Sequence, residues 1–357
     1  MKNYYKDLRD KAANPIIKYT RNPLFGYVIL ALVLVVIQLL FMFTDGIISL
    51  TISKAIVQTM IYTIVCLGLS ILIGRAGLTS LGTAGFMGLG AYIAGNILKF
   101  ANLPFIFVVI GTAAAAVILG VVVGFISLRV QGRALLIITL ALSEILIELF
   151  KTPNEFTGGA SGFTGVPFPK LMMFIQLNRE TTYFLVLVAL FIMIVLTLNI
   201  IKSPTGRAML TMASSPPAAQ AMGINLLKYR ILAFVIATVY AMIGGALYVA
   251  YVQGASPYSW TLLLSLNVLV AVVLGGVGSI PGVIMGSFVI FGLDLAVLKN
   301  IAFFQKYTSA SVIFSGLLII IIIIKYPGGL ARLLRDINVG VKKLYVKWRV
   351  YRYGQEA

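Results

Sequence analysis

Long apolar runs separated by short polar breaks dominate the chain. Three of the clearest lie at residues 27–43, 105–128 and 183–201, and each is about 17 to 24 residues long. At about 1.5 Å rise per residue, helices of that length cross a hydrocarbon core of about 30 Å. Because backbone polar groups in lipid must be paired within their own segment, these runs are predicted to be membrane-spanning helices.

The same pattern predicts an all-α, polytopic membrane protein with about ten transmembrane helices. A transmembrane domain at 24–325 would lie between basic tails at 1–23 and 326–357, with its longest external loop at 151–182. Several predicted spans are short or rich in glycine and serine, and the sequence leaves open whether 80–98, 134–150, 262–277 and 280–298 cross fully. The predicted spans are 24–43, 52–74, 80–98, 104–128, 134–150, 183–201, 230–253, 262–277, 280–298 and 308–325.

Composition excludes a soluble globular fold. Hydrophobic residues fill 60% of the 357 positions and charged residues only 11%, whereas soluble domains carry about 25% charged residues. The net charge of +18 reflects topology, since 21 of the 28 basic residues fall in the two tails, the 202–230 loop and turns on the same side. The positive-inside rule therefore predicts that both termini are cytoplasmic. These bases are not gathered on a polar domain, so nucleic-acid binding is not expected.

No constellation of residues predicts an enzyme, a cofactor or a metal site. The chain has no histidine, and its only cysteine, Cys66, lies inside an apolar run and is interpreted as a packing residue. A phosphate-binding loop with its lysine is absent, so the chain is not expected to hydrolyse ATP. The basic N-terminal stretch has no small-residue cleavage site, so no cleaved signal peptide is expected.

Residues 74–92 combine six glycines with three hydroxyl side chains, which weakens a regular helix. Irregular backbone at membrane depth is tolerated only where protein or a water-filled cavity surrounds it, and broken helices line substrate sites in many transporters. Plain close packing is an equally good reading. Glycines four residues apart, at 120/124 and 282/286, likewise favour close helix packing. The candidate pathway residues are Ser80, Gly82, Thr83, Gly85 and Tyr92.

Acidic residues inside apolar spans form a second candidate. Glu144 and Glu148 share one helix face, and Asp294 lies in a later span. An acid at the bilayer centre costs roughly 2.5–3.5 kcal/mol on insertion scales, so such residues should face protein or water. Glu144 is the deeper of the pair and is a candidate pathway residue, although a structural ion pair explains it equally well. An ion-coupled secondary transporter using Glu144 or Asp294 is therefore an alternative function.

The longest cytoplasmic connection, 202–229, is predicted to contain a short helix. Serines followed by Pro216 and Pro217 are typical of a helix start, and the helix is expected to run over about 216–227. Its apolar residues could dock into a partner or lie on the membrane surface.

Four stretches resemble, in order, the LivM-type permeases of branched-chain amino acid importers. AAQAMGIN at 218–225 with YRILAF at 229–234 is similar to the cytoplasmic signature of that family. AGLTSLG at 76–82, TGGASGFTGVP at 157–167 and VLGGVGSIPG at 273–282 resemble its other motifs. The resemblance covers about residues 26–325.

The resemblance implies a type II ABC importer permease-like fold in the bacterial inner membrane. It implies alternating access with a second related permease, two cytoplasmic ATPase subunits that carry ATP and Mg²⁺, and an extracytoplasmic substrate-binding protein. The helix at 216–227 would then be the coupling helix, and the glycine loop an external gate or binding-protein contact. The implied coupling residues are Pro217, Ala218, Ala219, Met222, Gly223 and Ile224, and the implied loop residues are Gly158, Gly159, Gly162 and Gly165.

Two departures from the family pattern affect these expectations. Ser214 to Pro217 stand where acidic residues often precede the paired alanines, so a charge contact to an ATPase is not expected there. Thr83 replaces a histidine of the family, which leaves the ligand open. Branched-chain amino acids come first, with other neutral amino acids, urea or short amides, and nucleosides as alternatives.

Overall fold

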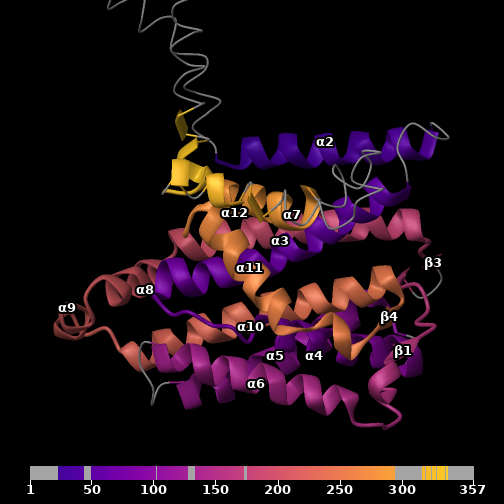
Figure 1. The fold of residues 1–357 in the computed structure, drawn as a ribbon, viewed down its shortest axis with the longest axis horizontal. Coiled ribbons are helices and arrows are strands. Elements are labelled where there is room, and N and C mark those ends of the chain that lie inside the picture. Colours follow the sequence, from indigo (N-terminus) through magenta and orange to yellow (C-terminus); the bar gives the residue numbers. More distant parts are fainter. Residues whose placement is uncertain are drawn as a thin grey trace, which may run out of the picture.

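The structure is a computed structural model of a helical bundle whose axes run roughly side by side (Figure 1). The N-terminal tail before Pro23, most of the predicted last span and C-terminal tail, and Asp294 lie outside the described residues. The residues described are 23–43, 50–101, 103–127, 133–172, 175–293, 316–317, 319–322, 324–326, 328–333 and 335–336.

The longest helices form the body of the bundle. Helix α10 (Leu226–Val252) lies at its centre and packs against α3 (Leu50–Ala76), α4 (Thr83–Asn96) and α5 (Phe105–Ser127). Helix α7 (Arg179–Lys202) packs against α3 and also contacts α10, where the Thr197 and Tyr240 hydroxyls are hydrogen-bonded (3.0 Å). Helix α2 (Pro23–Phe43) covers α7 as the outermost layer (Figure 1). The remaining long elements are α6 (Arg133–Lys151), α11 (Leu262–Gly275) and α12 (Ile280–Ser287), which continues as a π-helical segment (Phe288–Gly292).

Five helices among the described residues are long and apolar enough to cross a membrane. Two further apolar helices, at 26–40 and 280–292, are shorter, and α6 carries too many charged residues to count with the five. A polytopic all-α fold is therefore confirmed, and the number of ten crossings stays a prediction.

Close packing by glycine is confirmed at both predicted pairs. A Cβ atom on Gly120 would lie 2.7 Å from the Val235 Cα of α10, and Gly124 approaches α10 at Ile231 in the same way. Gly282 and Gly286 bring α12 against the backbone of α11. A side chain at Gly120, Gly282 or Gly286 would collide with the neighbouring backbone, and one at Gly124 would be tightly packed.

Short elements mark the two ends of the bundle. At one end, which we call the α9 end, α8 (Pro204–Ser214) and α9 (Pro216–Ala221) project beyond the long helices (Figure 1). At the other, the strand end, β1 (Phe163–Thr164) pairs antiparallel with β4 (Gly254–Ala255). There β2 (Lys170–Met172) also pairs with β3 (Ile175–Gln176), and single 3₁₀ turns lie at Gly159–Ser161 and Pro257–Ser259.

Candidate functional site

The break between α3 and α4 is held by hydroxyl groups from other helices. The Ala84 N–H donates to Ser265 Oγ of α11 (2.9 Å), and the Gly85 N–H donates to Ser143 Oγ of α6 (3.0 Å). The first N–H groups of a helix have no partner inside it, so these two hydroxyls do the work of an N-cap. The irregular backbone expected from the glycines is present over residues 77–82, whereas 83–96 is regular helix.

Gly82 and Gly85 let α6 approach this break. The Leu81 N–H donates to Thr139 Oγ1 (3.0 Å), and a Cβ on Gly82 would lie 3.0 Å from the Thr139 carbonyl oxygen. A Cβ on Gly85 would lie 2.9 Å from the Ser143 Cα. Both candidate pathway glycines are therefore packing contacts in this conformation.

Ser80 and Thr83 line a small closed space between α3, α4 and α10. Its volume is about 10 Å³, and its other walls are mostly apolar. Both residues are buried, and Ser80 Oγ accepts the Gly82 N–H (3.2 Å). A space of that size holds about one water molecule at most. The stretch is closed to a substrate here, and its role in a pathway stays a prediction.

Tyr92 belongs to an aromatic cluster in the half of α4 nearer the strand end. Its ring stacks on Phe150 of α6 (4.4 Å between centroids) and meets Phe163 of β1 edge-on (5.3 Å). A Cβ on Gly88 would lie 2.8 Å from Trp260 and 2.9 Å from Phe150, so Gly88 makes room for both rings. Tyr92 is thus separated from the Ser80–Gly85 stretch by about two turns of helix.

Glu144 does not lie with the other candidate pathway residues. It lies on the exposed face of α6, one residue from the buried Ser143 that caps α4. Glu148 lies one turn further along the same face and pairs with Lys151 at 2.9 Å. The hydrogen bond to the Glu148 carboxylate raises the pKa of the Lys151 ammonium above its usual value. Asp294, the other acid considered, lies outside the described residues.

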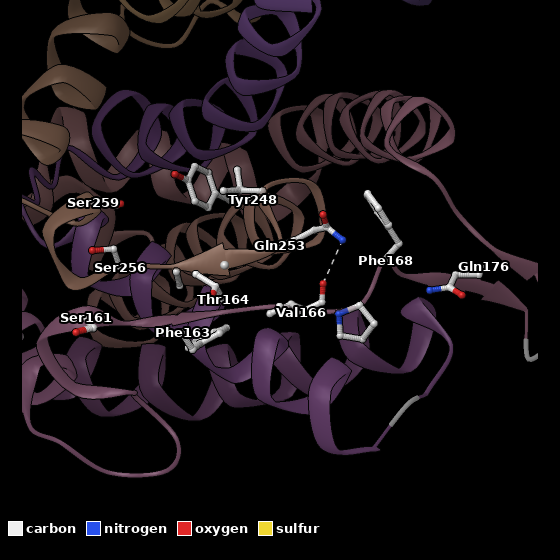
Figure 2. A pocket seen from close by; sticks show the side chains of 15 residues that line it. Ser161, Phe163, Thr164, Val166, Phe168, Gln176, Tyr248, Gln253, Ser256 and Ser259 are labelled. Carbon is white, nitrogen blue, oxygen red and sulfur yellow. Dashed lines mark hydrogen bonds between the residues drawn. The ribbon is translucent and has the colours of Figure 1, made fainter.

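An open cleft of about 660 Å³ lies at the strand end, between the end of α10 and the 161–168 loop. Figure 2 shows its uncharged polar side chains and the hydrogen bond that crosses it, from Gln253 Nε2 to the Val166 carbonyl oxygen (3.2 Å). The Val166 N–H donates back to the Gln253 carbonyl oxygen (3.2 Å). Gln253 itself has a φ of 61°, the left-handed region that favours glycine. The two segments are therefore joined by a specific pair of bonds.

The four candidate loop glycines lie in the loop that borders this cleft, and Gly165 lines it. All have positive φ, from 65° to 75°, which explains why glycine is needed at each. Gly162 lies against the backbone of Ala255 in β4, while Gly165 lines the cleft directly. Their predicted role as a gate or protein contact is untested. The complete set is Gly158, Gly159, Gly162 and Gly165.

The predicted coupling helix is shorter than expected. Ser215 Oγ accepts the Ala218 N–H (3.4 Å) and Pro216 occupies the first turn, as the sequence predicts. The helix nevertheless ends at Ala221, so the expected extent of 216–227 is wrong. Gly223, with a φ of 77°, turns the chain there, and Asn225 caps the separate helix α10 by accepting the Lys228 N–H (3.1 Å).

Most of this segment projects away from the protein. Met222 is 74% exposed, and Pro217, Ala218 and Gly223 are also exposed. Ala219 is fully buried, and Ile224 is half-buried with its N–H donating to the Ala219 carbonyl oxygen (2.9 Å). The α9 tip, residues 216–224, is therefore a small apolar projection with one buried anchor.

Helix α8 was not predicted from the sequence, although the sequence contains a helix-start pattern for it. Ser203 Oγ accepts the Gly206 N–H (3.1 Å) and Pro204 occupies the first turn, the same arrangement as at α9. A Cβ on Gly77, in the α3–α4 break, would lie 3.2 Å from Ala213 of α8. Helix α8 thus connects the α9 tip to the break in the membrane-spanning core.

Comparison with known proteins decides the family. A family model described as the permease component of branched-chain amino acid transport systems matches residues 51–323. The chain belongs to this family. As a member of this permease family it is a multi-pass membrane protein and a subunit of a transport system.

Individual permeases agree with the family. LivM, a permease protein of the high-affinity branched-chain amino acid transport system of Escherichia coli K12, is 32% identical over 303 residues, 78% of this chain and 69% of LivM. LivM of Salmonella typhimurium LT2 is 31% identical over 333 residues, covering 86% and 75%. LivH of E. coli K12, a different permease protein with the same system name, is 30% identical over 138 residues, 39% and 43%. Two kinds of permease in one system indicate a second permease subunit. No solved structure matches this permease.

Proposed function

We propose that this chain is the LivM-type permease subunit of an ATP-binding cassette importer that moves branched-chain amino acids into the cytoplasm by alternating access. The observation that carries the proposal is the exposed α9 tip, an apolar projection on a membrane-spanning permease. An exposed apolar tip on short, capped helices is suited to dock in a groove of another protein. The chain would use no cofactor of its own, and ATP and Mg²⁺ would bind to partner ATPases.

Movement of the tip would reach the core through α8. The tip is joined to α8 by a single capped turn, and α8 packs against α3 and α10. Buried Met209 and Met212 hold α8 in place, and Ala213 touches the α3–α4 break at Gly77. Closure of two ATPases on the tip would therefore displace the one irregular segment seen at the start of α4.

The exposed face of α6 is where we place the second permease and the substrate route. Glu144 cannot face lipid without a cost of roughly 2.5–3.5 kcal/mol, so protein or water must cover it. Ala141 and Ile145 share that face, whereas Thr139 and Ser143 on the other face bond to the α4 break. Movement of the break would reach this face through the Thr139 and Ser143 bonds on the other side of α6.

Orientation follows from charge and from the two ends of the bundle. The α9 end carries Arg75, Lys202 and Arg207, whereas the strand end holds the predicted external loop. We place the α9 end and both termini in the cytoplasm, and the strand end outside the inner membrane, where a substrate-binding protein would deliver its ligand.

The decisive test compares two substitutions at the exposed tip. The complex would be purified through this chain, its ATPase subunits identified, and leucine uptake and ATP hydrolysis measured in proteoliposomes with the binding protein. Met222→Asp places a charge at the docking surface without touching the core, so uptake should fall at least about tenfold with unchanged thermal stability. Met222→Leu keeps an apolar contact of similar size and should transport as the wild type.

Other outcomes would contradict the proposal. Purification of the chain without any ATPase, together with uptake driven by an ion gradient, would favour a secondary transporter. Uptake of urea or a nucleoside in place of leucine would be consistent with an ATP-driven importer but would contradict the proposed substrate. Equal uptake by Met222→Asp and Met222→Leu would remove the α9 tip from the coupling mechanism.

A further inference from the structure

Two buried hydrogen-bond donors lack partners near the cleft. Of the residues that the structure describes, three bury a side-chain nitrogen or oxygen without a hydrogen bond, at Arg75 Nε, Tyr92 Oη and Trp260 Nε1. Tyr92 is 4% exposed and Trp260 is fully buried. Leaving a buried donor unpaired costs about 1–3 kcal/mol, and native proteins keep few such groups. The Tyr92 and Trp260 donors therefore need an explanation.

The two donors lie in one aromatic cluster. Phe150 stacks on Tyr92, and it also lies with Trp260 against the small Gly88 of α4. A side chain at Gly88 would collide with the Trp260 ring at 2.8 Å. The cluster thus brings a phenol and an indole N–H to one place between α4, α6 and the turn before α11.

Two aromatic side chains connect this cluster to the cleft. Phe163 lines the cleft and meets Tyr92 edge-on, and Tyr248 lines it and meets Trp260 edge-on at 5.1 Å. Figure 2 shows these two rings on opposite sides of the cleft. Phe163 and Tyr248 are therefore in contact both with the cleft and with the two rings that carry the unpaired donors.

We propose that the cleft, with the Tyr92 hydroxyl and the Trp260 indole N–H behind it, is a binding site in the permease itself for the carboxylate of a neutral amino acid. This inference rests on the proposed function and adds a site that the substrate occupies after delivery. In the conformation described above, Phe163 and Tyr248 line the cleft, and the rings that carry the donors do not. In an open state the donors hydrogen-bond the carboxylate, and the energy of those bonds offsets the cost of leaving them unpaired before.

The lining favours a neutral zwitterion over a charged solute. The residues around the cleft are uncharged, with polar groups from Ser161, Thr164, Gln253 and Ser256 and backbone carbonyl oxygens that can accept from an ammonium group. The rings of Phe163 and Phe168 offer apolar surface for an aliphatic side chain. The cleft volume of about 660 Å³ falls within the range of roughly 300–1,000 Å³ typical of small-molecule sites.

Equilibrium binding of radiolabelled L-leucine to the whole transporter complex in nanodiscs, without the binding protein, tests the site. We expect saturable binding to the wild type. Tyr92→Phe removes only the hydroxyl and keeps the stacked ring, so the affinity should fall at least about tenfold, the effect of one hydrogen bond to a charged group. Tyr258→Phe is the matched control, because Tyr258 is 65% exposed at the same end and does not line the cleft, and its affinity should be unchanged.

Competition with L-leucinamide identifies the group that is held. The amide lacks the carboxylate, so at the wild type its inhibition constant should be at least about tenfold higher than that of leucine. The inhibition constant of the amide should be the same at Tyr92→Phe, because the hydroxyl is expected to bind only the carboxylate. Trp260→Phe gives a second readout on the other donor, with thermal stability measured beside it.

The outcomes separate this inference from the proposed function. Leucine uptake with the binding protein but no saturable binding without it would overturn the site and leave the importer in place. Equal leucine affinities for the wild type and Tyr92→Phe would mean that the hydroxyl is satisfied by aromatic faces alone, and would also overturn it. If the wild-type complex with the binding protein takes up no leucine, the proposed function itself is contradicted.

Discussion

At the scale of single residues, glycine decides whether the central helices meet. Gly245 of α10 and Gly90 of α4 each lie against the backbone of the opposing helix. A Cβ on Gly245 would lie 2.7 Å from the Ala91 nitrogen and closer still to the Met87 carbonyl oxygen. No flexible side chain stands there to move aside, so the contact tolerates nothing larger than hydrogen.

Gly245→Ala should therefore lower the free energy of unfolding by about 1–3 kcal/mol, the usual cost of overpacking. Thermal unfolding of the purified protein in detergent measures the effect. Gly111→Ala is the control, because that glycine is also helical and a Cβ there would meet only a side-chain atom at 3.4 Å. It should be neutral or slightly stabilising, since alanine favours helix by up to about 1 kcal/mol. Equal midpoints for the two variants would contradict the importance of the contact.

At the scale of elements, the two faces of helix α6 have different surroundings. Its buried face supplies the Thr139 and Ser143 hydroxyls that hold the α4 break. Its exposed face carries Glu144 beside Ile145. A helix with an acid on its outward face at membrane depth needs a polar or protein neighbour.

Ile145→Cys, labelled with a maleimide that carries a photoreactive group, should cross-link to the second permease subunit in native membranes, because that side chain is exposed on the face proposed for the interface. Ser143→Cys, two positions away and buried, should not. The native Cys66 is fully buried and gives a low background. Electrophoresis of the cross-linked membranes shows the product. Free reaction of Ile145→Cys with a lipid-soluble maleimide and no cross-link would instead place α6 against lipid.

Helices α8 and α9 show how much of a local structure a short sequence pattern predicts. Serine and proline correctly predict where α9 begins, because the cap and the missing proline donor act within one turn. The end at Ala221 is missed because Gly223 in a left-handed conformation closes the helix, and the following Asn225 starts α10 independently. The same cap before Pro204 predicts α8 once it is read in the same way.

At the scale of the whole molecule, the two ends should lie on opposite sides of the membrane. Met222→Cys in a Cys66→Ser background should react with an impermeant maleimide only in inside-out vesicles. Phe156→Cys, exposed at the strand end, should react only in right-side-out vesicles. If both cysteines are labelled from one side, the predicted number of crossings between them is wrong. If each is labelled from the opposite side to that expected, the predicted orientation is wrong.

Periodicity and charge predict the class of fold because a bilayer imposes length and apolarity on each span. They do not predict which helices touch. The hydroxyls of Ser143 and Ser265 cap α4 from positions 58 and 181 residues away along the chain, and no local pattern marks them. Trp260 and Phe150 are likewise brought beneath the cleft by packing alone. Tyr92 was recognised as a candidate from its motif, but its unpaired hydroxyl is visible only in three dimensions.

The glycine contacts between α4 and α10 also have a mechanical consequence. Where backbones touch without side chains between them, two helices cannot slide or tilt by a small amount without collision, because packed interiors resist continuous deformation. Helices α4 and α10 therefore form one stiff body, whereas α2 and α6 lie at the periphery (Figure 1). A displacement of the α9 tip would therefore be transmitted along this stiff pair of helices, and would move the helices that border it.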